Sequence, residues 1–273
     1  MLLLRLARVG IALLVIGLLG IGIISAQERE ARFSPPERLA ESGTIVYCGT
    51  LDNPPRAFIT EDGETAGFEV DLGVEIAARM GLEVEWEQMT FDGIIASLQA
   101  KRCDAVMQEL FIRAERLEII DMIPFAFSAQ SIVVPAGDAT GIAGPEDLAG
   151  MKVAVPNGTT IFNILTELNE ELEEQIDLVI LESTTDTFQQ LQVGQVDAVG
   201  TTNTAAAYYV GLTDTDLEFA GDSFGRILDG IGVNKDDPVL NVAMSAALAS
   251  IIADGTYAEL LDKWNLQGAS IGN

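Results

Sequence analysis

Arg116 occupies a position in the sequence that suits the binding of an anionic group. It ends a segment, residues 108–116, that follows a short, mostly apolar stretch at residues 104–107. The run is typical of a buried strand, and parallel sheets bind ligands beyond the carboxyl ends of their strands. A guanidinium is planar and pairs with a carboxylate through two hydrogen bonds. We therefore expect Arg116 to contact a ligand, with a surface ion pair to Glu115 or Asp121 as the alternative.

Gly158, Thr159 and Thr160 form a second candidate anion site. They stand between an apolar strand pattern at residues 152–155 and a helical pattern that begins at Ile161. The backbone N–H groups at the start of a helix suit an anion. A threonine at this position also caps a helix by itself, so the structural role and the ligand-binding role are compatible.

The elements that must position these residues alternate between helix and strand. Apolar residues recur every fourth position from 72 to 80, which predicts a helix, and every second position from 82 to 86, which predicts a strand. Such alternation predicts an α/β fold with a mostly parallel sheet. Residues 124–127 are expected to form an apolar loop. Further strands are expected at residues 44–48, 131–134, 177–181, 195–200 and 230–233, and further helices at 91–99, 186–192, 240–253 and 256–264.

One unit of the sequence occurs twice. The pattern Leu-Gln, four residues, Asp-Ala-Val begins at position 98 and again at position 191, which is 93 residues later (191 minus 98). The repeat suggests two similar lobes, and a cleft between two lobes is a usual place for a small ligand. Glu109 and Thr202 each lie five residues past the aspartate of their unit, so we expect both to face this cleft.

Composition and charge exclude several classes of function. The chain has 42 acidic and 15 basic residues and a net charge of −27, which argues against a nucleic-acid partner. It contains no histidine, which excludes a Ser-His-Asp triad and histidine-containing zinc sites. We expect neither a cofactor nor a metal. The two cysteines, Cys48 and Cys103, each stand beside a predicted strand, where we expect buried free thiols rather than a disulfide.

The N-terminal residues 1–26 have the pattern of a secretory signal. Two arginines precede a long apolar run, which ends in small residues. Retention of this segment as a membrane anchor is the alternative. Residues 27–43 are polar and are expected to form a tether. Either way, the rest of the chain is expected in the periplasm or outside the cell.

Several motifs occur in an order that resembles a known family. They are GFEVDL at residues 67–72, IRAERLEIIDMIP at 112–124, Gly-Thr-Thr at 158–160, and DGTY at 254–257 followed by Lys-Trp at 263–264. In this order they resemble the amino-acid-binding family of extracytoplasmic solute-binding proteins of ABC importers. The resemblance implies an α/β, two-lobe periplasmic-binding-protein-like fold (type II), in which each lobe is a mostly parallel sheet flanked by helices.

The resemblance also implies how the chain is divided. Residues 44–132 and 228–273 would form a discontinuous lobe 1, and residues 138–222 would form lobe 2. Two crossing strands, at residues 131–137 and 223–230, would act as a hinge that closes around the ligand. The closed form would dock on a membrane permease.

Site residues follow from the same resemblance. Arg116, Thr159 and Thr160 would hold the ligand carboxylate. Phe91 would place its ring over the ligand, with plain core packing as the alternative. Asp52 belongs to the loop after the first strand, which lines the pocket in the family.

Two positions depart from the family pattern. Thr202 stands where the family has an acid that binds the ligand's α-amino group, and Phe111 stands where it has serine or threonine. We hypothesise that Glu109 supplies the missing negative charge from lobe 1. In the alternative, Glu109 pairs internally with Arg113 or Arg116 and the ligand carries no amine.

The function expected from these observations is ligand capture rather than catalysis. The protein would bind a small carboxylate-bearing solute, most simply an amino acid, and deliver it to an ABC permease. An enzyme related to cyclic-carboxylate dehydratases of this fold is an alternative, with Glu109 as the only obvious acid near the arginine. A ligand-sensing partner of a membrane receptor is another.

Overall fold

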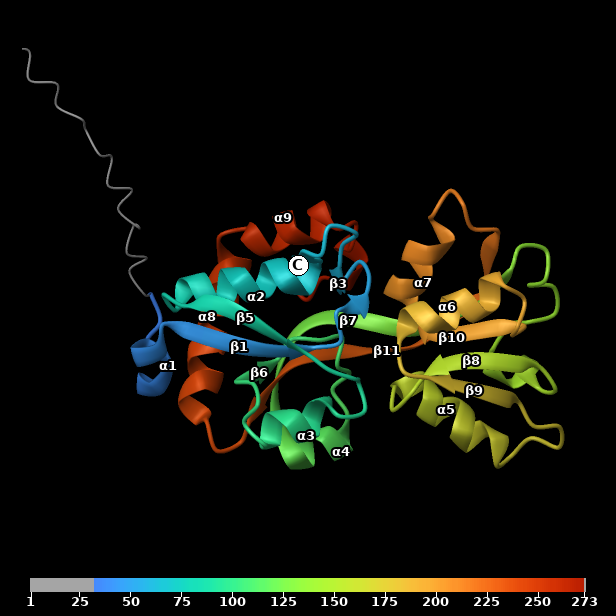
Figure 1. The fold of residues 1–273 in the computed structure, drawn as a ribbon, viewed down its shortest axis with the longest axis horizontal. Coiled ribbons are helices and arrows are strands. Elements are labelled where there is room, and N and C mark those ends of the chain that lie inside the picture. The colour runs from blue at the N-terminus through green and yellow to red at the C-terminus, as the bar shows by residue number, and fades with distance from the viewer. Residues whose placement is uncertain (1–31, 273) are drawn as a thin grey trace, which may run out of the picture.

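A single eight-stranded sheet runs through the protein in the computed structural model, which describes residues 32–272 (Figure 1). The strand order is β5-β1-β6-β11-β7-β10-β8-β9, and a separate three-stranded sheet has the order β2-β3-β4. The strands are β1 (Thr44–Gly49), β2 (Asp52–Asn53), β3 (Ala57–Ile59), β4 (Thr65–Ala66), β5 (Glu83–Gln88), β6 (Ala105–Val106), β7 (Ile120–Pro135), β8 (Lys152–Pro156), β9 (Asp177–Leu181), β10 (Ala198–Thr202) and β11 (Leu217–Asn234).

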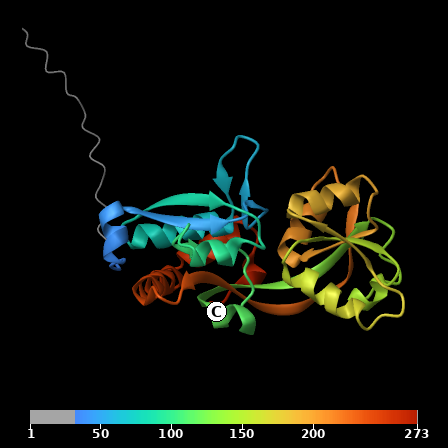
Figure 2. The same ribbon diagram turned by 60° about the horizontal axis from the view of Figure 1, so that its bottom comes forward.

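The large sheet supports two bodies that are joined by the long strands β7 and β11 (Figures 1 and 2). One group of apolar cores is built from residues 39–126 and 231–269. The other is built from residues 132–220. We call these bodies lobe 1 and lobe 2. The predicted two-lobe α/β fold is confirmed, while the residue limits of the lobes stay a prediction.

Helices cover both faces of the sheet in each lobe (Figure 1). In lobe 1, α2 and α9 lie on one side of the strands, and α3 and α4 on the other. In lobe 2, α6 and α7 lie on one side and α5 on the other. The helices are α1 (Glu37–Ser42), α2 (Phe68–Arg79), α3 (Ile94–Gln99), α4 (Ala114–Ile119), α5 (Thr160–Asn169), α6 (Thr184–Gln192), α7 (Asn203–Val210), α8 (Pro238–Ala253) and α9 (Thr256–Lys263), with short 3-10 helices at Pro145–Leu148 and Gln267–Ala269.

The predicted apolar loop at residues 124–127 is wrong, because these residues belong to strand β7. Beginning at Ile120, β7 pairs with β11 in an antiparallel ladder. Pro124 lies opposite Gly230, beside a shift of register between Asp229 and Gly230. A proline cannot donate to a ladder and is tolerated at such irregularities. The proline that suggested a loop therefore marks an irregular point in a continuous strand.

The prediction of two free thiols is also wrong, because Cys48 and Cys103 form a disulfide. Cys48 lies in β1, and Cys103 directly precedes β6, the parallel neighbour of β1. This pairing places the two Cα atoms 5.6 Å apart, within the normal range for a disulfide. The sequence pattern placed each cysteine beside a strand but did not show that the two strands are neighbours.

Part of the predicted tether is folded. Residues 37–42 form α1, whose Leu39 is buried in the lobe 1 core, and Gly43 ends the helix in the left-handed conformation. The predicted signal or anchor at residues 1–26 lies outside the described residues. In the part of the chain that the structure describes, no single helix has the length and apolar character needed to cross a bilayer.

Candidate ligand-binding site

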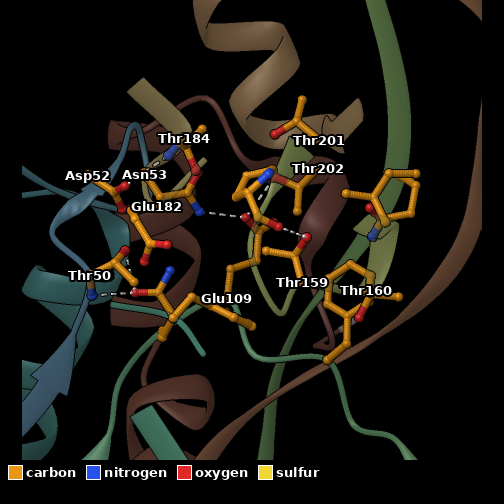
Figure 3. A pocket seen from close by; sticks show the side chains of 16 residues that line it. Thr50, Asp52, Asn53, Glu109, Thr159, Thr160, Glu182, Thr184, Thr201 and Thr202 are labelled. Atoms are coloured by element: carbon orange, nitrogen blue, oxygen red, sulfur yellow. Dashed lines mark hydrogen bonds between the residues drawn. The ribbon is translucent and has the colours of Figure 1, made fainter. Parts of the chain in front are cut away.

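A small cavity lies between the two lobes, beyond the ends of the central strands (Figure 3). The volume of this cavity is about 40 Å³. Its lining is Thr50, Asp52, Asn53, Phe91, Gln108, Glu109, Phe111, Gln130, Pro156, Thr159, Thr160, Ile161, Glu182, Thr184, Thr201 and Thr202. Seven of the predicted site residues are in this lining, and Arg116 and Gly158 lie next to it.

The lining is polar and acidic. It contains six threonines, three amide side chains and three carboxylates, namely those of Asp52, Glu109 and Glu182, but no lysine or arginine. Two aromatic rings, Phe91 and Phe111, and the apolar Pro156 and Ile161 complete it. The wall can therefore accept hydrogen bonds from a cationic group and donate them from hydroxyls and amides.

Arg116 contacts two residues of the cavity wall, Phe91 and Phe111. Its Nη1 donates to the Phe111 carbonyl at 2.9 Å, and its guanidinium carbon is 5.5 Å from the centre of the Phe91 ring. The side chain begins in α4, and the residue is only 8 % exposed. Among the described residues no carboxylate lies within 4.0 Å of it. Its suggested partners Glu115 and Asp121 pair instead with Arg113 and Lys235.

The electrostatics of Arg116 follow from this burial. Loss of solvent and, to a smaller extent, the nearby charge of Arg113 lower the pKa of the guanidinium to about 10, against the opposing effect of Glu115. A buried charge is costly unless it is paired. Arg116 is therefore a buried cation that a ligand anion would stabilise.

The start of α5 forms the lobe 2 side of the cavity. Thr159 is the N-cap of the helix, because its hydroxyl accepts from Phe162 N at 3.4 Å and donates to the Pro156 carbonyl at 2.8 Å. Gly158 has a φ of +68°, and a Cβ at this position would lie 2.9 Å from the Cβ of Asp92 in lobe 1. Glycine thus lets the two lobes approach closely at this point.

Asp52 connects lobe 1 to α6 of lobe 2. Its Oδ2 accepts a hydrogen bond from the backbone N–H of Thr184 at 2.9 Å. Burial raises the pKa of Asp52 above its ordinary value, against the hydrogen bonds from Thr50 and Thr184. Asp52 thus lines the cavity and contributes to the contact between the lobes.

Glu109 has a different ion partner from either arginine suggested by the sequence. Arg56 Nη2 lies 3.4 Å from Glu109 Oε1, whereas neither Arg113 nor Arg116 forms an ion pair with it. Burial acts to raise the pKa of Glu109, but the charge of Arg56 and three hydrogen bonds outweigh burial and lower it. The suggested internal pairing with Arg113 or Arg116 is therefore wrong, and Glu109 stays ionised beside the buried Arg56.

Several residues in the lining or next to it were missed by sequence reasoning. Asn53 and Arg56 belong to the same loop as Asp52, and Gln108 directly precedes Glu109, so proximity to a predicted site residue was their only signal. Gln130 lies in the part of β7 that did not resemble a strand. It is 1 % exposed, and its Oε1 has no hydrogen-bond partner among the described residues.

The fold and the cleft define a two-lobe solute-binding protein. Residues 45–267 match the sequence profile of the bacterial extracellular solute-binding proteins, family 3, and the chain belongs to this family. Similar relatives include the L-cystine-binding protein TcyJ of Escherichia coli (strain K12), which is 30% identical over 228 residues (83% of this chain and 84% of the relative). The lysine/arginine/ornithine-binding periplasmic protein of the same strain is 30% identical over 229 residues (80% and 86%).

Solved structures show the same architecture. Holo ArgBP from T. maritima superimposes with a TM-score of 0.73 at 31% identity, covering 84% of this chain and 98% of that protein. The ancestral amino acid-binding protein AncCDT-1, a precursor of cyclohexadienyl dehydratase, superimposes with a TM-score of 0.77 at 32% identity (83% and 97%).

Proposed function

We propose that the protein captures an amino acid in the cleft between its lobes and delivers it to the permease of an ABC importer. The observation that carries the proposal is Arg116, a buried guanidinium beside the cavity that has no carboxylate partner within residues 32–272. Opposite it, the N-terminus of α5 presents Thr159 and Thr160 from lobe 2. Membership of a family of extracellular solute-binding proteins supports the role.

The proposed binding mode uses both lobes. The ligand carboxylate lies between the guanidinium of Arg116 and the N–H groups at the start of α5, where a helix terminus favours an anion. The three carboxylates in the lining favour a ligand that also carries a positive group. A lining without lysine or arginine does not favour a ligand with a second acidic group.

The place of action follows from the family and from the N-terminal sequence. We propose that residues 1–26 direct the chain out of the cytoplasm, where closure of the lobes presents the loaded form to the membrane permease. The relatives named above are described as periplasmic or as amino-acid-binding proteins, which supports this assignment.

Binding is favoured over catalysis by the state of Glu109, the acid that the sequence suggested for a catalytic role. A dehydratase would need a general acid that holds a proton near neutral pH. Glu109 has a lowered pKa and accepts hydrogen bonds from several side chains, so it holds a proton poorly. We therefore favour binding over catalysis for this chain, in line with its similarity to the ancestral amino acid-binding protein AncCDT-1.

A thermal-shift screen tests the proposal. Refolded protein, freed of any co-purified ligand, is heated alone and with L-arginine, L-histidine, L-lysine, L-cystine and dicarboxylic acids such as succinate. A ligand that binds only the native state raises the midpoint, by the equivalent of about 2.7 kcal/mol at one hundred times its Kd. We expect at least one zwitterionic amino acid to raise the midpoint and succinate to have no effect. The proposal fails if no amino acid does so.

A further inference from the structure

Glu109 has no free acceptor capacity in this structure. Its Oε1 accepts from the hydroxyls of Ser128 at 2.6 Å and Thr204 at 2.7 Å. Its Oε2 accepts from Asn53 Nδ2 and from the hydroxyl of Thr202, both at 2.8 Å. A carboxylate offers about four lone-pair sites. A ligand amine could approach this carboxylate only if one of the four donors left.

The four donors come from different parts of the molecule. Asn53 belongs to lobe 1, and Ser128 lies in β7, where the chain passes between the lobes (Figure 1). Thr202 ends β10 and Thr204 lies in the first turn of α7, so both belong to lobe 2. Glu109 itself follows β6 of lobe 1. Its carboxylate is therefore a point at which lobe 1, the hinge and lobe 2 meet.

Arg56 holds Glu109 in place from inside lobe 1. The Arg56 side chain is fully buried, and its Nη2 lies 2.5 Å from the Ser128 hydroxyl, 3.0 Å from Asp229 Oδ2 and 3.4 Å from Glu109 Oε1. This arrangement holds the carboxylate in one place and in its ionised form. Hydrogen bonds to an ionised acceptor are about twice as strong as those between neutral groups.

A change at Thr204 can test closure of the lobes apart from direct contact with the ligand. It donates to Glu109 at 2.7 Å but does not belong to the lining of the cavity. Thr202, by contrast, donates to Glu109, lines the cavity and also caps α7. A change at Thr204 can therefore reach a bound ligand only indirectly, through Glu109, through the Thr202 hydroxyl 3.2 Å away, or through the position of lobe 2.

We propose that Glu109, held by Arg56, is a positioning residue that closes the two lobes through Thr202 and Thr204 even without ligand, and that it sets ligand affinity through this closure rather than by touching the ligand. The effect on affinity rests on the proposed function, whereas the closure itself does not. Ligand binds with an apparent affinity that is reduced when the competent form is only partly populated. Loss of a donor to Glu109 should therefore weaken every ligand of the cleft by one common factor.

The first experiment needs no ligand. Small-angle X-ray scattering is recorded on refolded, ligand-free wild type, Thr204→Val and the control Thr166→Val. The control removes a hydroxyl that donates within lobe 2, to the Phe162 carbonyl at 2.7 Å. We expect a larger radius of gyration for Thr204→Val alone. Equal radii for Thr204→Val and the wild type overturn the proposal, whether or not any amino acid binds.

The second experiment distinguishes closure from direct contact. Calorimetry compares L-arginine with 5-guanidinopentanoate, which lacks only the α-amine, on the wild type, Thr204→Val and Glu109→Gln. We expect each variant to weaken both compounds by the same factor, about tenfold for Thr204→Val, the scale of a hydrogen bond to a charged group. A much larger loss for L-arginine than for 5-guanidinopentanoate in Glu109→Gln overturns the proposal in favour of direct amine contact. If L-arginine does not bind the wild type, the proposed amino-acid ligand loses support. The scattering experiment alone then tests whether Glu109 closes the lobes.

Discussion

Replacement of Asp229 by asparagine should change how the stability of the protein depends on pH. Asp229 is fully buried in β11 next to Arg56, Glu69 and Glu109. Its pKa is raised from 3.8 to about 7, because burial and the charge of Glu109 together outweigh the opposing effect of Arg56. The hydrogen bonds agree with a protonated Asp229. Ser128 Oγ lies 2.6 Å from both Glu109 Oε1 and Asp229 Oδ2, and its single proton can be donated to only one of them.

The sign and size of the effect follow from this raised pKa. The folded state holds the Asp229 proton more tightly than the unfolded chain, so its contribution to stability is full at low pH and is lost as the pH rises towards 7. One pKa unit corresponds to about 1.36 kcal/mol. Over the roughly 2.5 units between pH 4.5 and 7, Asp229 should therefore lower the free energy of unfolding by about 3 kcal/mol.

Urea unfolding at several pH values between about 4.5 and 8 measures this effect. Asp229→Asn keeps the shape of the neutral acid, so its free energy of unfolding should fall less with rising pH than that of the wild type. Burial also raises the pKa of Glu69, so the free energy of unfolding of Asp229→Asn should still fall somewhat as the pH rises. Asp262→Asn, a change at an exposed aspartate, is the control and should follow the wild type. Parallel profiles for Asp229→Asn and the wild type would refute the reasoning.

Two further changes have expected outcomes. Breaking the disulfide with Cys48→Ser and Cys103→Ser frees a loop of 55 residues and should lower the free energy of unfolding by about 4 kcal/mol, measured by urea unfolding; an unchanged midpoint would contradict this. Gly158→Ala introduces a Cβ 2.9 Å from the Cβ of Asp92, so the lobes should close less fully. Scattering at saturating L-arginine should give a larger radius of gyration than for the wild type, and an identical radius would show that the approach at Gly158 is not limiting.

Much of the fold could be predicted because it depends on local periodicity. The apolar spacing of residues 82–86 predicted β5 within two residues of its observed ends, and that of residues 72–80 predicted α2 within one residue at its end and four at its start. Strand β7 was only partly predicted, because Pro124 interrupts the local signal and the ladder with β11 comes from residues about a hundred positions away. The disulfide was missed for the same reason, since it depends on β1 and β6 being neighbours.

The candidate site could be predicted in part. The sequence placed Phe91, Glu109 and Thr202 near one cleft, and all three line the cavity. It did not reveal Arg56, whose charge is compensated by Glu109, 53 residues away in the chain (109 minus 56). Ion pairs of this kind arise from tertiary packing and leave no periodic signal. The ligand-contact roles of the predicted site residues stay predictions.

Calorimetry on Arg116→Ala tests the central claim most directly. The amino acid that raises the wild-type midpoint in the thermal-shift screen is titrated into the wild type, Arg116→Ala and Arg116→Lys, after circular dichroism has shown that the variants are folded. Loss of a buried charge pair costs on the order of 2–5 kcal/mol, so binding to Arg116→Ala should fall by roughly 30-fold or more. Lysine should restore little, because it lacks the planar fork that matches a carboxylate. Equal affinity of Arg116→Ala and the wild type would contradict the account.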